Sequence, residues 1–355
     1  MHLLIAGALI AVLLMSGCAA QPGKFTYLTS TETHVFPVPP AQPRFRFVGA
    51  LTGETNFVHE QKQGPSAKKV FSWIVGLVAG EDMPRRFQRP QSGWKDPYTG
   101  RIYVTDVGRK AVFVFDPAQG FLYLWDSADK GLGFITPLAV TGGPQGTVLV
   151  TDAELHAVIV LDAEGKPLRH IQHKSLLRPV GVVRVAEAGE IYVSDAQTHD
   201  IKVFADDGSL KRTLGLKGQN AGEFIGPTHL AWRDGQLYVT DTLNSRVQVL
   251  SSEGKWLKTI GKRGMYIGDM PRPKGVAVDD EGRVYVVESY HDYLLVYDAE
   301  GRFLLPVGGS GRGIGQFYLP AGVWVNERHI FVADTFNGRV MVFEYLGEPV
   351  NNKSS

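Results

Sequence analysis

Short apolar segments that end in an acidic residue recur along most of this chain. The six copies read IYVTD, VLVTD, IYVSD, LYVTD, VYVVE and IFVAD, and they end at Asp106, Asp152, Asp195, Asp241, Glu288 and Asp334. Their successive spacings are 46, 43, 46, 47 and 46 residues. A fixed period of this length is typical of proteins built from repeated structural units. The pattern therefore predicts six units that share one local structure.

Each unit is predicted to contain four short strands. A first apolar segment follows a proline, as in PLAV, PVGVV, PTHLAW, PKGVAV and PAGVWV at Pro137, Pro179, Pro227, Pro273 and Pro320. The segment with the acidic end is the second strand, segments such as AVIVLD form the third, and a glycine turn leads to a more polar fourth, such as WLKTIG. These segments are rich in β-branched and aromatic residues and show no helical period. Four antiparallel strands, repeated radially, describe the blades of a β-propeller.

The two ends of the repeat region complement each other. The fourth strands continue into glycine-spaced tails such as IGKRGMYIGDM, and the N-terminal segment RFRFVGALTGETNF has the same form. No first three strands precede that segment, whereas the last unit stops after its third strand at FEYL. We therefore predict that residues 44–57 supply the outer strand of blade six, which removes exposed strand edges. The predicted fold is all-β: a six-bladed propeller of four-stranded antiparallel blades over residues 44–346, closed by this N-terminal outer strand, with a polar tail over residues 347–355.

The N-terminus carries a possible targeting signal. An apolar run from Leu3 to Met15 precedes Cys18, the single cysteine of the chain. The run is too short to span a bilayer comfortably and is typical of a signal peptide. The residues LMSGC resemble the lipobox of bacterial lipoproteins, which implies a signal peptide over residues 1–17 and a lipid on Cys18. The following Ala19 implies the outer membrane if the cell is Gram-negative, and an ordinary secretory signal is the alternative.

Two segments lie outside the repeats. Residues 18–43 contain Pro22, Pro37, Pro39, Pro40 and Pro43 among polar residues, and we expect them to form a tether between the lipid and the folded body. Residues 65–80, PSAKKVFSWIVGLVAG, could place their large apolar side chains on one side of a short helix. We expect this insertion to pack on the rim of the propeller. A patch that touches a partner or a membrane is the alternative.

Composition excludes some partners. The chain has 37 basic and 36 acidic residues, so its net charge of +1 gives no reason to expect nucleic acid. Hydrophobic residues make up 44% of the chain, which is ample for a buried core.

The best copies of the repeat, VTDTLNSRVQVL (239–250) and VADTFNGRVMVF (332–343), resemble the NHL-repeat family. The resemblance implies a propeller but no particular function, because this fold hosts many functions. We expect the repeated aspartates to accept hydrogen bonds from loop N–H groups and the Asn-x-Arg pairs to brace neighbouring blades.

Deviations from the repeat indicate where a ligand could bind. Because strands one and two are antiparallel, the loops after each acidic residue and the proline-led starts converge on one face around the channel. The candidate residues on that face are Lys110, His156, His199, His229, Glu288, Tyr290 and His291. Four histidines, His156, His199, His229 and His291, could supply the nitrogens of a zinc site.

Two enzyme classes with related propellers offer precedents. VTDAELHAVIVLD resembles a motif of the peptidyl-hydroxyglycine amidating lyases, which implies a zinc-binding role for His156. The other zinc histidines of that family directly follow the proline of strand one, where this chain has Leu138, Val180, Thr228, Lys274 and Ala321. The calcium-dependent lactonases need channel-lining Glu, Asn and Asp side chains, and Glu288, Asn244 and Asn337 are candidates.

We therefore expect a lipid-anchored propeller of the bacterial cell envelope that binds a protein, peptide or glycan through its channel face. In this interpretation the chain performs no chemistry of its own and needs no cofactor. The alternative is a metal-dependent lyase or hydrolase, with zinc or calcium held by the histidines of the same face.

Overall fold

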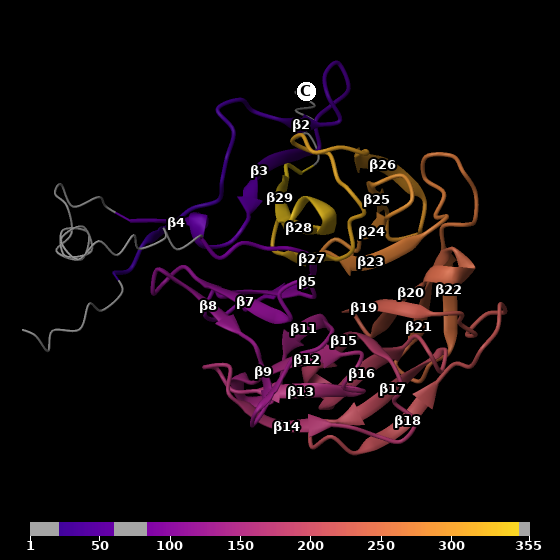
Figure 1. Cartoon of the computed structure of the whole chain (residues 1–355). Helices are drawn as coiled ribbons and strands as arrows, with labels where there is room; N and C mark the ends of the chain where they lie inside the picture. Colours follow the sequence, from indigo (N-terminus) through magenta and orange to yellow (C-terminus); the bar gives the residue numbers. More distant parts are fainter. Residues whose placement is uncertain (1–20, 60–83, 348–355) are drawn as a thin grey trace, which may run out of the picture.

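The computed structural model describes residues 21–59 and 84–347, which form a ring of six blades around a central channel (Figure 1). The signal peptide of residues 1–17, the predicted lipid site Cys18 and the insertion of residues 65–80 lie outside the described residues. Within the described part of the chain, no helix has the length and apolar composition needed to cross a membrane. The six-bladed all-β prediction is confirmed.

The first three blades follow one another along the chain. Blade one contains β5 (Pro90–Lys95), β6 (Ile102–Asp106), β7 (Ala111–Asp116) and β8 (Phe121–Trp125). Blade two contains β11 (Pro137–Gly142), β12 (Val148–Asp152), β13 (Ala157–Leu161) and β14 (Pro167–Ile171). Blade three contains β15 (Pro179–Val185), β16 (Glu190–Asp195), β17 (Asp200–Ala205) and β18 (Leu210–Leu214). A small hairpin, β9 (Ser127–Asp129) with β10 (Leu132–Gly133), joins blades one and two.

The last three blades repeat the arrangement. Blade four contains β19 (Pro227–Arg233), β20 (Gln236–Asp241), β21 (Arg246–Ser251) and β22 (Trp256–Ile260). Blade five contains β23 (Pro273–Val278), β24 (Val284–Glu288), β25 (Tyr293–Tyr297) and β26 (Phe303–Gly308). Blade six contains β27 (Val323–Asn326), β28 (His329–Asp334), β29 (Arg339–Tyr345) and β3 (Phe45–Leu51). Single 3-10 turns occur at Glu54–Asn56, Pro144–Gly146, Ala186–Ala188, Thr242–Asn244 and Thr335–Asn337.

The N-terminal strand closes the ring as predicted. β3 pairs antiparallel with β29, from Phe45 opposite Tyr345 to Leu51 opposite Val340. In Figure 1 the indigo β3 lies beside the yellow β29, although the two are almost 300 residues apart in sequence. This pairing gives blade six its outer strand, so the two ends of the described chain hold each other.

The residues before β3 also lie against the ring. β2 (Val35–Phe36) pairs with β3 and adds a fifth strand to blade six, and the ring of Phe36 lies 5.7 Å from that of Phe343. β1 (Lys24–Phe25) pairs with β4 (Phe57–Val58) beside blade one. The tether predicted over residues 18–43 is thus described from Gln21 onward, where it packs on the propeller through its few large apolar side chains.

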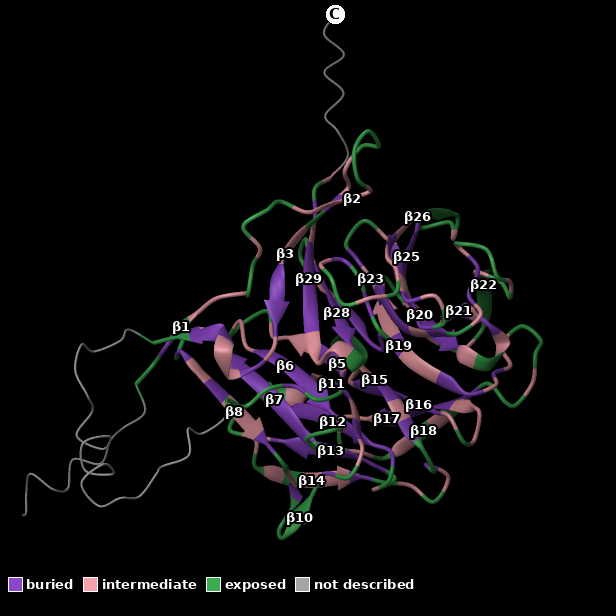
Figure 2. Cartoon of the chain, turned by 45° about the horizontal axis from the view of Figure 1, so that its top comes forward, coloured by how far each residue is buried: buried purple, intermediate pink, exposed green. Residues whose placement is uncertain are grey.

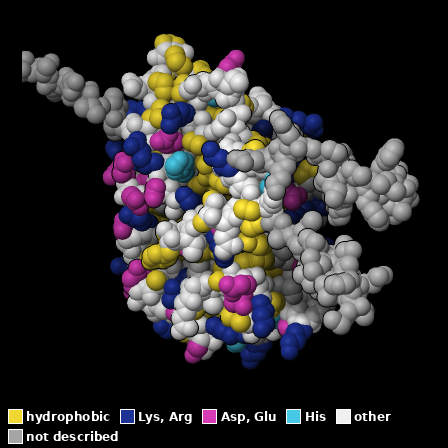
Figure 3. Space-filling model, turned by 90° about the vertical axis from the view of Figure 1, so that its left-hand side faces the viewer, with side chains coloured by type: hydrophobic (Ala, Val, Ile, Leu, Met, Phe, Trp, Pro, Cys, Tyr) yellow, Lys and Arg dark blue, Asp and Glu magenta, His cyan; other side chains and the backbone are white. Residues whose placement is uncertain are grey.

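Burial falls from the middle strands to the outer ones. The second and third strands, such as β12 and β13, are buried at every position, whereas a fourth strand such as β22 is largely exposed (Figure 2). The apolar clusters lie between blades, since each combines side chains from two neighbours, as Tyr192 of blade three and Val239 of blade four do. The hydrophobic core therefore consists of contacts between neighbouring blades. On the side wall seen in Figure 3, basic, acidic and apolar side chains are interspersed.

Candidate binding face around the channel

The prolines of the first strands and the acidic ends of the second strands meet at one face, which we call the channel face. Pro137 pairs with Asp152, and the same register joins Pro227 to Asp241. Loops that join strands one and two, or three and four, lie on the opposite face. The convergence predicted from strand direction is therefore observed.

The repeated acidic residues are structural acceptors. Asp152 is fully buried, and its carboxylate accepts hydrogen bonds from the backbone N–H groups of Ile135 (2.8 Å) and Thr136 (3.0 Å), which precede strand one. It also accepts the N–H groups of Glu154 and Leu155 in the loop after strand two. Each such carboxylate ties together the two loops that its blade contributes to the channel face. This use of the aspartates was predicted and is observed.

The Asn-x-Arg pairs brace the connections between blades. Asn244 donates to the carbonyl of Gly218 (2.9 Å), and Arg246 donates to Asp241 and to the carbonyl of Glu223. Gly218 and Glu223 belong to the segment that joins blade three to blade four. Asn337 and Arg339 make the equivalent contacts in blade six. The side chains of these residues hold the connections between blades in place, as the repeat pattern predicts.

The backbone conformation explains which residue types occur four positions after each acidic residue. All six residues there have positive φ: Lys110 (52°), His156 (51°), His199 (63°), Ser245 (59°), Asp292 (61°) and Gly338 (62°). This left-handed conformation disfavours branched and bulky residues and is enriched in Asn, Asp, His and Gly. His156 and His199 are therefore turn residues of the loop, a constraint that the sequence showed only as a repeated spacing.

Three of the four predicted histidines make side-chain contacts in the loops of the channel face. The His156 Nδ1 atom contacts the carbonyl of Leu177, and the His199 Nδ1 atom accepts the N–H of Gly226 (3.0 Å). The His291 Nδ1 atom lies 3.1 Å from the Glu288 carboxylate. Of the other candidates, Lys110 and Tyr290 are exposed. Only His229 of the predicted set lines the channel cavity described below.

Hydroxyl groups that sequence reasoning missed join the inner strands of successive blades. The Thr151 hydroxyl accepts the N–H of Ala139 (2.9 Å) and donates to the carbonyl of Val180 in the next blade (2.7 Å). Thr105 and Ser194 make the same bridge from blades one and three. The signal was the Thr or Ser that precedes the aspartate in the VTD and VSD segments.

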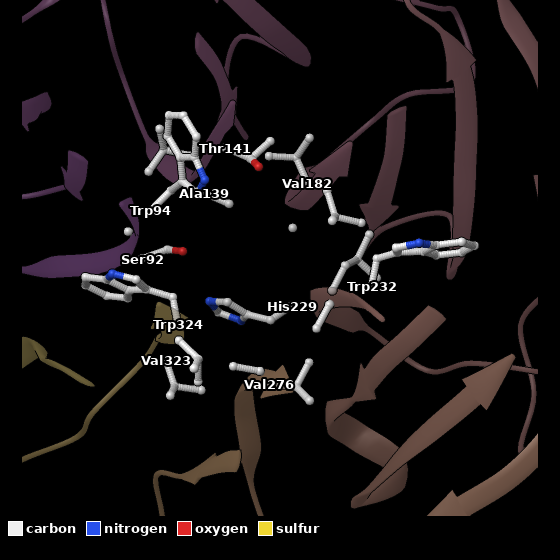
Figure 4. Close-up of a pocket in the computed structure, with 18 of the residues that line it drawn as sticks. Ser92, Trp94, Ala139, Thr141, Val182, His229, Trp232, Val276, Val323 and Trp324 are labelled. Carbon is white, nitrogen blue, oxygen red and sulfur yellow. The ribbon is translucent and has the colours of Figure 1, made fainter. Parts of the chain in front are cut away.

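The third residue of each first strand is small in five blades. These residues are Ser92, Ala139, Gly181, Gly275 and Gly322, and blade four has His229 instead. Neighbouring strands approach closely here, since a Cβ on Gly181 would lie 2.3 Å from the Thr228 carbonyl oxygen. The imidazole of His229 extends into the channel, toward Ser92 and Trp324 (Figure 4).

The channel holds a cavity of about 270 Å³, lined by the first strands of all six blades. Most of its lining residues are aliphatic or aromatic, with Trp94 stacked on Tyr103 and Trp324 stacked on Phe331, each at 5.3 Å between ring centres, but polar atoms supply about half of the surface that faces the cavity. None of the residues lining the cavity is acidic. The size is near the lower limit of small-molecule sites, which commonly measure about 300–1,000 Å³.

Two titratable side chains on the inner strands of adjacent blades, His229 and Lys274, have lowered pKa values. Burial and the charge of Lys274 lower the pKa of His229 to about 4, although a hydrogen bond with the backbone of Lys274 acts in the opposite direction. Burial and the nearby Arg272 lower the pKa of Lys274. The imidazole is consequently neutral near pH 7, because its pKa lies well below that pH.

The channel-lining residues do not fit a zinc or calcium centre. Among residues 21–59 and 84–347, no three His, Cys, Asp or Glu side chains lie close enough to hold a metal ion. Glu288 accepts the N–H groups of Arg272, Tyr290 and His291. Asn244 and Asn337 are bound to loop carbonyls. Of the candidate ligands, His229 alone lines the cavity, and one imidazole does not make the set of about three or more protein ligands that zinc or calcium requires.

Sequence comparison places the chain in a family. Residues 90–307, more than half of the chain, match the family model described as SMP-30/Gluconolactonase/LRE-like region. The chain belongs to this family. Residues 271–354 also match a model described as 6-bladed beta-propeller. None of the curated proteins matches the chain.

Solved structures similar to this SMP-30/Gluconolactonase/LRE-like chain share its fold at low sequence identity. Virginiamycin B lyase from Staphylococcus aureus is 12% identical, with a TM-score of 0.54 over 73% of this chain and 96% of that chain. An auxiliary nutrient binding protein from Bacteroides thetaiotaomicron is 12% identical, with a TM-score of 0.60 over 73% and 69%. A luciferin-regenerating enzyme is 14% identical, with a TM-score of 0.57 over 74% and 92%.

Proposed function

We propose that this chain is a binding module of the bacterial cell envelope that recognises a partner protein or peptide through its channel face. The observation that carries the proposal is a set of large apolar side chains exposed on the loops of that face. They are Leu243, Met265, Tyr266, Ile267, Tyr290, Tyr318 and Phe336. Tyr266 is 85% exposed, and several such side chains gathered on one face are typical of an interaction surface.

Charge on the two faces favours an acidic partner. Exposed basic residues on the channel-face loops outnumber the exposed acidic ones, which are Asp126, Asp129 and Glu154; the basic residues include Arg86, Arg89, Arg109, Lys110, Lys217, Lys262, Arg263, Arg272 and Arg312. The exposed acidic residues on the loops of the opposite face include Glu164, Glu187, Asp280, Glu281 and Glu300. The chain as a whole is nearly neutral, but its exposed basic residues predominate on the channel face and its exposed acidic residues on the opposite face. A basic surface with exposed aromatic groups suits a partner that carries acidic and apolar side chains.

The lipid anchor would leave the channel face accessible. The N–H of Gly23 donates to the carbonyl of Gly120, in a loop of the opposite face. Cys18 precedes Gly23 by five residues, which span at most about 18 Å when extended. A lipid on Cys18 would therefore hold the opposite face near the membrane, and the outer membrane of a Gram-negative cell remains part of this proposal.

The lyase or hydrolase alternative has less support. The four histidines proposed for a zinc site have separate local partners or line the channel singly, and no acidic side chain lines the cavity. Elemental analysis of the purified chain tests it directly. Stoichiometric zinc or calcium that is lost in His156→Ala would favour the enzyme.

Site-specific photo-crosslinking in cells tests the binding proposal. A photoreactive residue at Tyr266 or Leu243 should capture one discrete protein, whereas the same residue at Tyr98 should not. Tyr98 is a matched control because it is 96% exposed and lies in a loop of the opposite face. Equal adducts from both faces, or no adduct from Tyr266 and Leu243, would contradict the proposal. Adducts with a glycan would support the glycan alternative instead.

A further inference from the structure

The channel cavity begins at the third residue of each first strand, counted from the proline. Ser92, Ala139, Gly181 and His229 line the cavity at this position, whereas no second residue of a first strand lines it. Sixth residues such as Trp232 line it as well. The cavity therefore extends from His229 away from the channel face, toward the opposite face.

A second cavity, of about 390 Å³, adjoins the channel cavity on that side. The two cavities share Trp94 and Thr141 as lining residues. The second cavity is also lined by Tyr98 and Gly146, which belong to loops of the opposite face. A small molecule can therefore approach the channel cavity from the opposite face, away from the loops on which the proposed partner would dock.

Three polar groups on two blades point into the channel cavity (Figure 4). They are the Ser92 hydroxyl and the Trp94 indole N–H of blade one and the Thr141 hydroxyl of blade two. Among residues 21–59 and 84–347, none of these three groups has a hydrogen-bond partner. An indole N–H can only donate, whereas a hydroxyl can donate or accept. The cavity thus offers hydrogen-bond donors to a ligand.

His229 supplies a hydrogen-bond acceptor from blade four. Its imidazole is neutral near pH 7 and has a single N–H, which bonds to the backbone of Lys274. The other ring nitrogen carries a lone pair and can only accept. Because the ring extends into the cavity toward Ser92 (Figure 4), a ligand that donates a hydrogen bond can reach it.

The cavity wall carries no charge. Among the described residues that line it, His229 is the only one with a titratable acid or base that changes near neutral pH, and it is uncharged there. Val182, Val276 and Val323 form apolar parts of the wall (Figure 4). A charged ligand would lose hydration in this cavity without gaining a counter-ion, which is unfavourable. The wall therefore favours an uncharged ligand that both donates and accepts hydrogen bonds.

We propose that the channel cavity binds an uncharged primary carboxamide: its N–H donates to His229, its carbonyl oxygen accepts from Trp94 or Ser92, and its apolar body lies against the valines. An amide carries its donor and its acceptor on different atoms, which suits protein groups that come from different blades. A carboxylate has no donor for the imidazole. The volume of about 270 Å³ restricts the ligand to a small molecule or a single side chain. This site does not depend on whether a protein docks on the channel face.

Calorimetric titration of the full-length chain with benzamide, acetophenone and benzoate tests the proposal. The three molecules have nearly the same shape, but acetophenone lacks the N–H donor, and benzoate lacks it and is charged. Benzamide should bind about tenfold more tightly than either, because an unmet hydrogen bond or a buried unpaired charge weakens the other two.

A pair of histidine variants locates the binding. His229→Phe keeps a planar ring but removes the acceptor, so it should weaken benzamide binding about tenfold and leave acetophenone binding unchanged. His173→Phe is the matched control, because His173 lies on a loop and does not line the cavity, and it should change neither affinity.

Three results would overturn the proposal: no saturable binding of benzamide, binding of acetophenone or benzoate as tight as that of benzamide, or equal effects of the two histidine variants. If His229→Phe does not fold, the unaltered chain still decides, because the comparison of benzamide with acetophenone and benzoate needs no variant.

A second titration distinguishes two sources of the amide. N-acetylglutamine N-methylamide, which carries the primary amide on a peptide side chain, is compared with benzamide. Tighter binding of the peptide derivative supports an amide side chain of another protein, and tighter binding of benzamide supports a free small molecule. Both results uphold the carboxamide site.

Discussion

Replacement of Asp241 by alanine tests the structural role of the repeated acidic residues. The carboxylate is fully buried and accepts hydrogen bonds from the Ile225 N–H (2.8 Å), the Asn244 amide (2.8 Å) and the Arg246 guanidinium (2.9 Å). Removing one partner from a buried ion pair costs about 3–5 kcal/mol, mainly because the other charge is left unpaired. Arg246 is 15% exposed and can regain some hydration. We therefore expect a loss of about 3–4 kcal/mol in the free energy of unfolding.

Urea unfolding followed by circular dichroism measures this loss from the midpoint and the slope. Asp207→Ala is the matched control, because Asp207 lies in an exposed turn and its carboxylate bonds to the neighbouring Ser209. The control should unfold like the unaltered chain. A loss below about 1 kcal/mol in Asp241→Ala would refute the reasoning, because it would mean that the buried donors find other partners at little cost.

Two further predictions concern pH. A hydrogen bond from Arg212 lowers the pKa of Glu190 to about 2, so its contribution to stability is complete above pH 4.5 and is lost as the pH falls toward 2. Glu190→Gln should remove this pH-dependent part of the free energy of unfolding, which is on the order of 2 kcal/mol. Urea unfolding measured between pH 4.5 and 2 tests this, and the same decrease in the variant as in the unaltered chain would contradict it. The pKa of His229 is about 4 against an ordinary 6.5, so the unfolded chain binds a proton first and stability should fall between pH 6.5 and 4. His229→Asn should reduce the decrease in the free energy of unfolding over this pH interval by on the order of 1–2 kcal/mol. His173 lies on a loop and does not line the cavity, so His173→Asn should leave the decrease unchanged.

The ring could be predicted from local information. The period of the acidic segments gives the number of blades, and alternation within each segment gives the strands. The missing strand of the last unit was matched by residues 44–57, and the pairing of β3 with β29 confirms it. The additional strand β2 was not predicted, because two residues of strand-like sequence among prolines carry no periodic signal.

The candidate site was only partly visible in the sequence. Histidines at equivalent repeat positions suggested a metal site, yet His156 and His199 occupy a left-handed turn position and bond to loop backbone. A repeat pattern places side chains on a common face, but it does not show whether they point into the channel or contact a neighbouring loop. Within the described residues, no metal-binding group of His, Cys, Asp and Glu is formed on this face.

The sequence by itself determined the propeller, the closure of the ring and the structural use of the aspartates, because these depend on short-range pattern and strand direction. Only the tertiary structure brought the start of β23 against β19, where the Thr228 hydroxyl donates to the carbonyl of Lys274 (3.3 Å), because residues 46 positions apart meet only when neighbouring blades pack. It also decided that His229 extends into the channel cavity while the other histidines of the predicted set do not line it. The reason is physical: the distance between side chains of neighbouring blades depends on how closely their inner strands pack, and small residues at the third position set that packing.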